Sequence, residues 1–329
     1  MTGLDVDERV LARVDPVVLA KSGPFGRAML EIGARRPDVV ALSADVAGVT
    51  GLAPFAQAFP DRFVNVGMAE QNLIAVAVGL EKAGFTPVAT TFAVFATRRA
   101  LDFITVQCAL NEANVKIVAA LPGIYSTFGP THQGIEDLAH MRAIPNLVVL
   151  DPCDNAEMAA AAYAAVEHRG PVYLRELLGR ETADVDRGGL EFEIGPGQRL
   201  RAGSDVGIVA SGIMVRQALD AASELAERGV SAAVLKMSTI KPFDGAAVLD
   251  LARTTGALVT AENHTVVGGL FSAVAEVLAE AGTGVPVRSV GVRDEFCSFG
   301  SNEYVARTHG LTADAVVDAA LAALAVQRP

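Results

Sequence analysis

The sequence predicts an α/β protein built from two three-layer α/β/α domains. Short apolar runs rich in β-branched residues alternate with alanine-rich helical stretches, which indicates crossover units on a mainly parallel sheet. A polar, glycine-rich stretch at residues 181–204 interrupts this alternation, and a second block of strands and helices follows it. The length of 329 residues suits about two domains of roughly 100–200 residues each.

The first block is expected to begin with a strand at residues 37–45. The helix expected at 69–84 ends at Gly84, because glycine readily adopts the left-handed conformation that closes a helix. Asp154 marks the N-cap region of another helix, which Gly170 closes. Further strands are expected at 85–93, 115–121, 146–151 and 171–176, and a further helix at 96–113.

The second block repeats the alternation, and Thr312 is expected to N-cap its last helix. Its strands are expected at 205–212, 231–238 and 257–263, and helices at 267–282 and before 229. The predicted organisation is an N-terminal arm at 1–18, a first domain at 19–180, a linker with a short hairpin at 181–204, and a second domain at 205–329. The arm is either mobile or binds a partner, and the residues leave both readings open.

The composition argues against several classes of function. The net charge is -11 and no long basic run occurs, so we expect neither nucleic-acid binding nor attachment to an anionic membrane. We expect no membrane span, which needs about 20 apolar residues in a row, and no signal peptide. The three cysteines are far apart and lack metal-ligand spacing, which favours reduced thiols in a cytoplasmic protein over a disulfide framework or a metal site.

Three segments contain candidate catalytic or ligand-binding residues. Residues 65–72, NVGMAEQN, place Glu70 at the start of an apolar helix, where an acid can simply complement the helix dipole. Residues 91–96, TFAVFA, hold two phenylalanines three apart, a spacing that is common in cores. Residues 128–146 contain a Gly-Pro-Thr-His-Gln turn before a helix, which packing alone explains poorly. His132 in such a loop is well placed to contact a ligand, and a surface histidine with its hydrogen bonds satisfied is the alternative.

Together, in this order and spacing, the segments resemble the transketolase family. The family's G-x-x-E-x-N, T-F-x-x-F and G-P-T-H-Q-x-x-E patterns, with R-x-I-P-N, match Gly67–Asn72, Thr91–Phe95, Gly129–Glu136 and Arg142–Asn146. The carboxyl half also resembles the family's terminal domain, in Ser238–Asp244 and Glu262–Leu270. The resemblance implies a pyrimidine-binding domain with a mainly parallel sheet, followed by a C-terminal domain with a mixed sheet.

The resemblance also implies thiamine diphosphate as the cofactor. Glu70 matches the acid that hydrogen-bonds the pyrimidine ring and favours its imino form, which a carboxylic acid in a dry pocket can do. Phe92 and Phe95 match the aromatic pocket around the pyrimidine, and Asp45 matches an acid near the cofactor. His132 matches a histidine that binds sugar hydroxyls during carbon–carbon cleavage, and it is the second candidate catalytic residue.

The family's diphosphate and Mg²⁺ site is missing from the sequence. Its G-D-G…N element lies on another domain, and we find no such element here. We therefore expect a partner subunit that carries this element and holds the diphosphate and Mg²⁺, with no metal ligands on this chain. A heterotetramer of two such pairs, with active centres at the interface, would fit the family's symmetry.

The expected substrate contacts depart from the family pattern. Residues 20–22, Ala-Lys-Ser, replace an A-T-R element that includes a phosphate-binding arginine, and Phe128 replaces an acid. Ala120 and Leu121 lie where the family has Thr-His. Arg175 matches a family arginine that binds the substrate phosphate, although a surface charge at a strand end is the simpler reading. Either the substrate differs from ordinary pentose phosphates, or the partner and Lys21 compensate.

Three hypotheses about function follow. The first is the pyrimidine-binding subunit of a split transketolase, which transfers a two-carbon ketol unit from a ketose to an aldose or another acceptor. The second is the beta subunit of a 2-oxoacid dehydrogenase first component, or a related acyl-forming enzyme. The third is a non-catalytic scaffold that keeps the fold. The Gly-Pro-Thr-His-Gln loop favours the first, because a sugar offers hydroxyls for it to hold.

Overall fold

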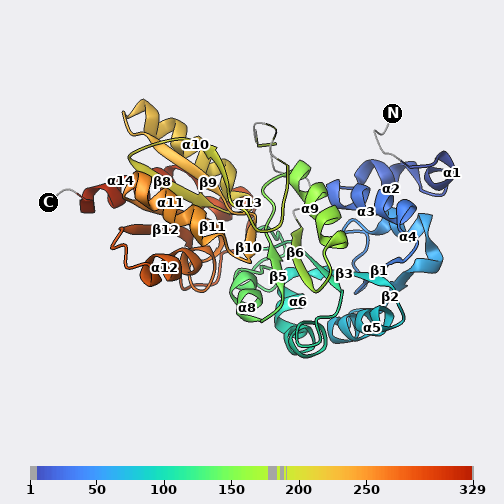
Figure 1. Cartoon of the computed structure of the whole chain (residues 1–329). Helices are drawn as coiled ribbons and strands as arrows, with labels where there is room; N and C mark the ends of the chain where they lie inside the picture. The colour runs from blue at the N-terminus through green and yellow to red at the C-terminus, as the bar shows by residue number, and fades with distance from the viewer. Residues whose placement is uncertain (1–5, 177–183, 186–188, 190, 328–329) are drawn as a thin grey trace.

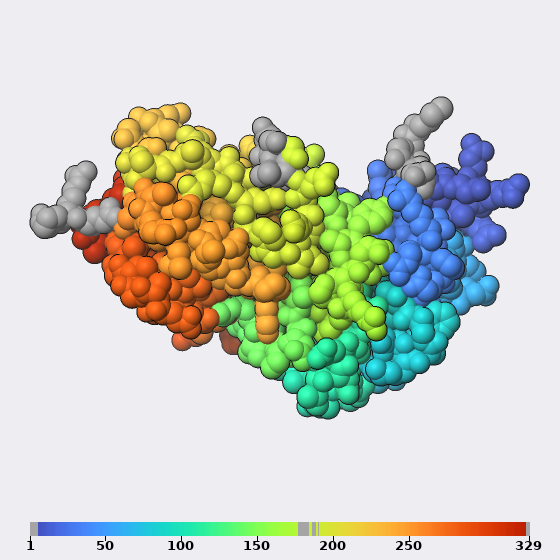
Figure 2. Space-filling view, viewed as in Figure 1, coloured from blue at the N-terminus to red at the C-terminus, as the bar shows by residue number. Residues whose placement is uncertain are grey.

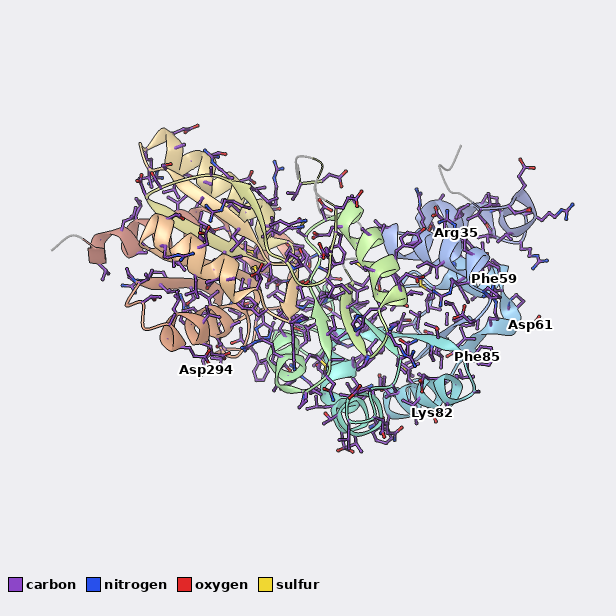
Figure 3. All side chains as sticks on the ribbon, viewed as in Figure 1. Arg35, Phe59, Asp61, Lys82, Phe85 and Asp294 are labelled. Carbon is purple, nitrogen blue, oxygen red and sulfur yellow. The ribbon has the colours of Figure 1, made fainter. Side chains whose placement is uncertain are left out.

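The fold consists of two α/β units that lie side by side (Figure 1). The computed structural model describes residues 6–176, 184, 185, 189 and 191–327. Figure 2 shows the yellow and orange residues of the second unit packed against the green residues of the first along a broad seam. In Figure 3, Lys82 and Phe85 lie on the first unit and Asp294 lies on the second.

The first unit is built on a sheet of seven strands, counted over the described residues. Its strand order is β10-β5-β6-β4-β3-β1-β2, and all neighbours pair in parallel except β10 with β5. The strands are β1 (Val39–Ser43), β2 (Phe63–Asn65), β3 (Thr86–Phe92), β4 (Lys116–Ala120), β5 (Val148–Leu150), β6 (Val172–Glu176) and β10 (Thr239–Lys241).

Helices cover both faces of this sheet, because its strands are apolar on both sides. In β1, Val39 and Ala41 pack with α3 and α9, whereas Val40 and Leu42 face α5. The helices are α1 (Glu8–Leu11), α2 (Pro16–Lys21), α3 (Pro24–Arg35), α4 (Ala53–Ala58), the 3-10 helix η1 (Pro60–Arg62), α5 (Glu70–Lys82), α6 (Ala93–Arg99), α7 (Leu101–Phe103), the π-helix η2 (Ile104–Ala109), α8 (Asp137–Ala143) and α9 (Asn155–Glu167). This is the predicted three-layer arrangement.

The second unit has a mixed sheet of five strands among the described residues, in the order β12-β11-β8-β9-β7. Only β7 runs antiparallel to its neighbour. The strands are β7 (Gln198–Arg201), β8 (Val206–Ala210), β9 (Ala232–Lys236), β11 (Leu258–Thr265) and β12 (Val287–Val292), and the helices are α10 (Met214–Glu227), α11 (Gly245–Thr255), α12 (Leu270–Glu280), α13 (Asn302–Thr308) and α14 (Ala313–Gln327). The two units confirm the predicted fold class.

Three local predictions were wrong. The described part of the linker forms no hairpin, because β7 pairs with β9 of the second sheet. The segment 239–241, which was expected to lie in the second domain, becomes β10 and joins the first sheet, so the second block of the sequence contributes to both units. The helix expected at 96–113 begins earlier, at Ala93, and is interrupted at Ala100, beyond which it continues as α7 and a π-helical turn.

The segment Asn302–Val326 is long and apolar enough to cross a membrane by length and composition alone, although we expected no such run. In the fold it is split into α13 and α14, with Gly310 at positive φ between them. Val316, Val317 and Ala320 of α14 are buried against α10 and the second sheet. The apolar character of α14 is thus explained by its packing in the core of the second unit.

The described part of the expected N-terminal arm packs on the first unit. It forms α1 and α2, which Asp7 and Asp15 cap by accepting bonds from the backbone. Val14 is buried with Leu30 of α3 in a small apolar cluster. Residues 1–5 lie outside the described part, so the choice between a mobile and a partner-binding arm stays open there.

Two buried polar side chains at the end of β11 hold this region together, one within the second unit and one across to the first. Glu262 accepts hydrogen bonds from the backbone N–H groups of Leu270 and Phe271 at the start of α12, at 2.7 and 2.8 Å. His264 accepts a bond from the backbone N–H of Ala139, at 3.2 Å, and thereby ties β11 to α8 of the first unit. Glu262 therefore fixes the start of α12 within the second unit, whereas His264 serves the junction between the units.

His264 is expected to make the chain less stable in mild acid. Burial lowers the pKa of its imidazole from 6.5 to about 4. Between these values the unfolded chain binds a proton that the folded chain excludes, so stability falls as the pH falls, by about 3 kcal/mol at most. Glu262, whose pKa burial raises to about 7, acts with the opposite sign.

A His264→Gln variant isolates this effect, because glutamine keeps a donor and an acceptor but does not titrate. Unfolding in urea at about pH 7 and about pH 4.5 gives the free energy of unfolding at both ends of the window. We expect the native chain to lose more stability between the two than the variant does. Equal losses in both proteins would contradict the prediction.

Candidate active site

The candidate site lies at the carboxyl ends of the parallel strands, where open α/β sheets usually bind ligands. Phe92 ends β3, Asp45 follows β1 by two residues, and the segment 121–136 follows β4. Val46, the neighbour of Asp45, packs with Phe92 and Leu121 in one small apolar cluster. The fold thus brings together residues that come from three separate strand ends.

Four rings, which we call the aromatic cluster, form the centre of the site: Phe92, Phe95, Phe128 and His132. The rings of Phe92 and Phe128 are stacked, with centroids 6.4 Å apart and 21° between their planes. His132 approaches Phe95 and Phe128 with centroid distances of 5.1 and 5.3 Å. Phe92 is buried, but Phe128 is 57% exposed, so the cluster offers an open aromatic face.

Glu70 is the first residue of α5, and it is buried beside this cluster. Its Oε1 accepts a hydrogen bond from Nη1 of Arg99 at 2.9 Å. The Arg99 guanidinium also lies over the Phe95 ring, 4.0 Å from the centroid, and so links Glu70 to the cluster. Among the described residues Oε2 of Glu70 has no hydrogen-bond partner, which leaves one carboxyl oxygen for a ligand.

Arg99 was missed in the sequence, although a signal for it exists. It lies four residues after Phe95 on α6, and side chains at that spacing are neighbours on a helix surface. An arginine at that position therefore stacks on the Phe95 ring. Its guanidinium contacts Glu70 on another helix only because α5 packs against α6.

Asp45 is exposed and adopts a positive φ of 63°. It exchanges two hydrogen bonds with Asn65: Nδ2 of Asn65 donates to the Asp45 carboxylate at 2.9 Å, and the Asp45 backbone N–H donates to Oδ1 at 3.1 Å. Oδ1 of Asn65 also accepts a hydrogen bond from the backbone N–H of Gly67, which precedes Glu70 in the chain. Leu121, at the end of β4, is likewise held at positive φ, and such strain in non-glycine residues is common at functional sites.

Arg175 does not lie where either sequence reading placed it. Its side chain is 1% exposed, so it is not a surface charge. Its Nε donates to Oδ2 of Asp137 at 2.8 Å, a second bond runs from Nη2 to Oδ1 of the same carboxylate, and Nη1 lies 3.3 Å from Asp151. With its guanidinium enclosed by two buried carboxylates, Arg175 is not available to a substrate phosphate.

Comparison with known proteins places the chain in a family. Residues 20–177 match the model of the transketolase pyrimidine-binding domain, and residues 195–316 match that of the transketolase C-terminal domain. The 6-deoxy-6-sulfo-D-fructose transketolase subunit SqwH of a Clostridium species is 45% identical over 293 residues, which cover 89% of this chain and 90% of that protein. The chain belongs to the transketolase family. Its two units are the pyrimidine-binding and C-terminal domains of a split transketolase subunit.

Two further proteins are similar to this chain over most of its length. A solved structure described as a split gene transketolase, inactive beta4 tetramer, is 45% identical, with a TM-score of 0.83 over 93% of this chain and 98% of that one. The 1-deoxy-D-xylulose-5-phosphate synthase 1 of Geobacter sulfurreducens is 37% identical over 314 residues, covering 95% of this chain and 49% of that enzyme. Family membership implies a transferase-type enzyme that uses thiamine diphosphate.

The site's residues fit the pyrimidine end of that cofactor. Phe92 and Phe95 of the aromatic cluster present ring faces on which a flat heterocycle can pack. Glu70, itself a buried residue, presents a carboxyl oxygen to which no described residue donates a hydrogen bond. Oε1 of Gln133 is buried and has no hydrogen-bond partner among the described residues. No group of three or more metal-ligating side chains occurs in the part of the chain that the structure describes.

Proposed function

We propose that this chain is the half of a two-subunit transketolase that activates thiamine diphosphate, and that it transfers a two-carbon ketol unit from a ketose to an aldose or another acceptor. The observation that carries the proposal is the pairing of Glu70 with the aromatic cluster, linked through Arg99. A scaffold without catalytic function would have no need for a buried carboxyl group beside an open aromatic face.

The chain's own residues would divide the work as follows. Glu70 shares a proton through its free oxygen with the pyrimidine ring, while Arg99 holds the other oxygen and fixes the carboxyl group in place. Phe92 and Phe95 pack against the pyrimidine face and exclude water, and Asp45 lies at the edge of the same site. When bound, the cofactor supplies the nucleophilic carbon that cleaves and forms carbon–carbon bonds. His132 donates to or accepts from sugar hydroxyls.

The partner in this proposal is a diphosphate-binding subunit that carries the G-D-G…N element and holds Mg²⁺. Two such pairs would form a heterotetramer with active centres at the subunit interface. The description of the related split gene transketolase as an inactive beta4 tetramer supports a need for a second subunit. We place the complex in the cytoplasm, and the three buried cysteines, which form no disulfide among the described residues, support that placement.

The substrate in this proposal is a sugar other than an ordinary pentose phosphate. Arg175 is enclosed by carboxylates, and Phe128 offers a ring face where the family has an acid. The relative from Clostridium is named for a sulfonated ketose, 6-deoxy-6-sulfo-D-fructose. Because Lys21 is exposed near the domain start, Lys21 or the partner would supply the charge that binds an anionic sugar end.

Reconstitution tests the proposal. The chain is mixed with a subunit that carries G-D-G…N, thiamine diphosphate and Mg²⁺, and is offered fructose, xylulose 5-phosphate, 6-deoxy-6-sulfo-D-fructose or pyruvate, each with an aldose acceptor. We expect aldose release from a ketose only when both subunits are present. Full activity of the isolated chain would refute the need for a partner.

The likeness to 1-deoxy-D-xylulose-5-phosphate synthase keeps the acyl-forming alternative in view. In the same assay, release of carbon dioxide from pyruvate without ketose cleavage would favour an acyl-forming enzyme or the beta subunit of a 2-oxoacid dehydrogenase. If no reaction occurs with any donor and the complex does not bind thiamine diphosphate, the result favours the hypothesis of a non-catalytic scaffold.

A further inference from the structure

The segment between β4 and α8, residues 121–136, is a closed loop that carries Phe128 and His132 at its tip. Its ends are joined because the Gly123 N–H donates to the carbonyl of Gly134 at 2.8 Å. The neck residues are buried, whereas Phe128 is exposed. A loop with joined ends and an exposed tip transmits the geometry of its neck to the side chains at the tip. We call this segment the substrate loop.

Asn263, from the C-terminal domain, fills the neck of the substrate loop. It is 1% exposed. Its Oδ1 accepts a hydrogen bond from the N–H of Ile124 at 3.0 Å, and its Nδ2 donates to the carbonyl of Pro122 at 3.1 Å. A Cβ atom at Gly123, which has a φ of +65°, would lie only 2.2 Å from Oδ1 of Asn263. Asparagine thus satisfies both polar groups that flank Gly123, and glycine leaves it the necessary room.

The C-terminal domain also holds the substrate loop beyond its neck. The N–H of Thr265 donates to the carbonyl of Ile135 at 2.7 Å. Nε2 of Gln133, beside His132, donates to the carbonyl of Ser298 at 3.4 Å. The ring of Phe299 lies against Gly129, beside Phe128, since a Cβ built there would be 2.7 Å from the ring. The loop is therefore held by β11 and by the segment after β12.

We infer that the C-terminal domain is part of the substrate site and that Asn263 and Phe299 are positioning residues, which act on the substrate through His132 and Phe128. The inference rests on the proposed function for the role of those two tip residues. Glu70 and Phe95 come from α5 and α6, and no described residue of these helices forms a hydrogen bond with Asn263 or Phe299. Loss of the contacts that Asn263 and Phe299 make with the substrate loop should therefore weaken binding of the sugar more than binding of the cofactor.

The test uses Asn263→Ala and Phe299→Ala, with Phe296→Ala as the matched control. Phe299 and Phe296 lie in the same segment and are 71% and 76% exposed. Phe299 lies against Gly129 near the tip of the substrate loop, whereas Phe296 lines a pocket at the loop's carboxyl end, with Ile135 and Glu136. Hydrogen exchange of the isolated chains reports on the loop without any need for activity. We expect amides of residues 124–134 to exchange about tenfold faster or more in Asn263→Ala, with Phe296→Ala unchanged.

Kinetics on the reconstituted complex then separate positioning from general damage. For Asn263→Ala and Phe299→Ala we expect kcat/KM for the ketose to fall about tenfold or more, mainly through KM, because misplaced contacts weaken substrate binding. The Kd of thiamine diphosphate and the affinity for the partner subunit, both measured by calorimetry, should stay within about twofold.

The outcomes divide cleanly. Unchanged loop exchange in Asn263→Ala, or an equal loss of cofactor and sugar affinity, would overturn the inference. If Asn263→Ala does not fold, Phe299→Ala decides, because its side chain is at the surface. If the native complex processes no sugar, the proposed function fails. Hydrogen exchange still tests whether Asn263 and Phe299 hold the substrate loop in place.

Discussion

Glu70→Gln is expected to abolish ketol transfer while leaving the fold intact. The glutamine amide keeps an acceptor for Arg99 and occupies nearly the same volume, so α5 and its contact with α6 should persist. It cannot share an acidic proton with the pyrimidine ring. We expect the rate to fall about 10²–10⁴-fold, the range typical for loss of a positioned acid or base.

Exchange of the thiazolium proton with deuterium, followed by NMR in the assembled complex, measures this step directly. Glu81→Gln provides the control, because it makes the same substitution on the same helix away from the aromatic cluster. We expect native exchange rates in the control and a near-complete loss in Glu70→Gln. An unchanged exchange rate in Glu70→Gln would sink the assignment of Glu70.

Arg175→Met is expected to destabilise the chain more than any single change at the surface. It would leave Asp137 and Asp151 buried with no cation between them. Burial pushes the pKa of Asp137 up, but Arg175 overcomes this and holds it below its usual value. Breaking a buried ion pair from one side typically costs about 3–5 kcal/mol, so we expect a loss of that order near neutral pH.

The free energy of unfolding in urea measures this loss. Arg216→Met is the matched control, because Arg216 pairs with Asp220 at 47% and 48% exposure, and such pairs contribute about 1 kcal/mol or less. The contribution of Asp137 is present above its unfolded pKa and is lost as the pH falls, so the difference between native and variant should shrink in acid. Equal destabilisation by the two variants would show that the buried pair has no special role.

The local parts of the fold could be predicted because they depend on residues close together in the chain. The apolar run of β1 and the helix at Glu70–Lys82 can be recognised in the sequence from the spacing of apolar residues and from the composition. The end of a helix at a glycine follows from backbone sterics alone. The segment Thr239–Lys241 was harder, because three residues carry no period, and their pairing with β5 depends on how the two units meet.

The candidate site divides in the same way. Glu70, Phe92 and His132 stand in short motifs whose order is characteristic, so they could be singled out, and their roles remain proposals. Arg175 also stands at a motif position, yet its surroundings contradict the reading. Asp137 and Asp151, which enclose it, come from other parts of the chain, and nothing local to Arg175 announces them.

By itself the sequence determined two α/β units, the family and the identity of the acid at the start of α5, since these follow from periodicity and contiguous motifs. Only the tertiary structure decided which charges are buried together, that Arg99 reaches Glu70, and that Asn263 closes the neck of the substrate loop. The physical reason is range: backbone preferences act over a few residues, whereas the partner of a buried polar group is chosen by the packing of distant segments.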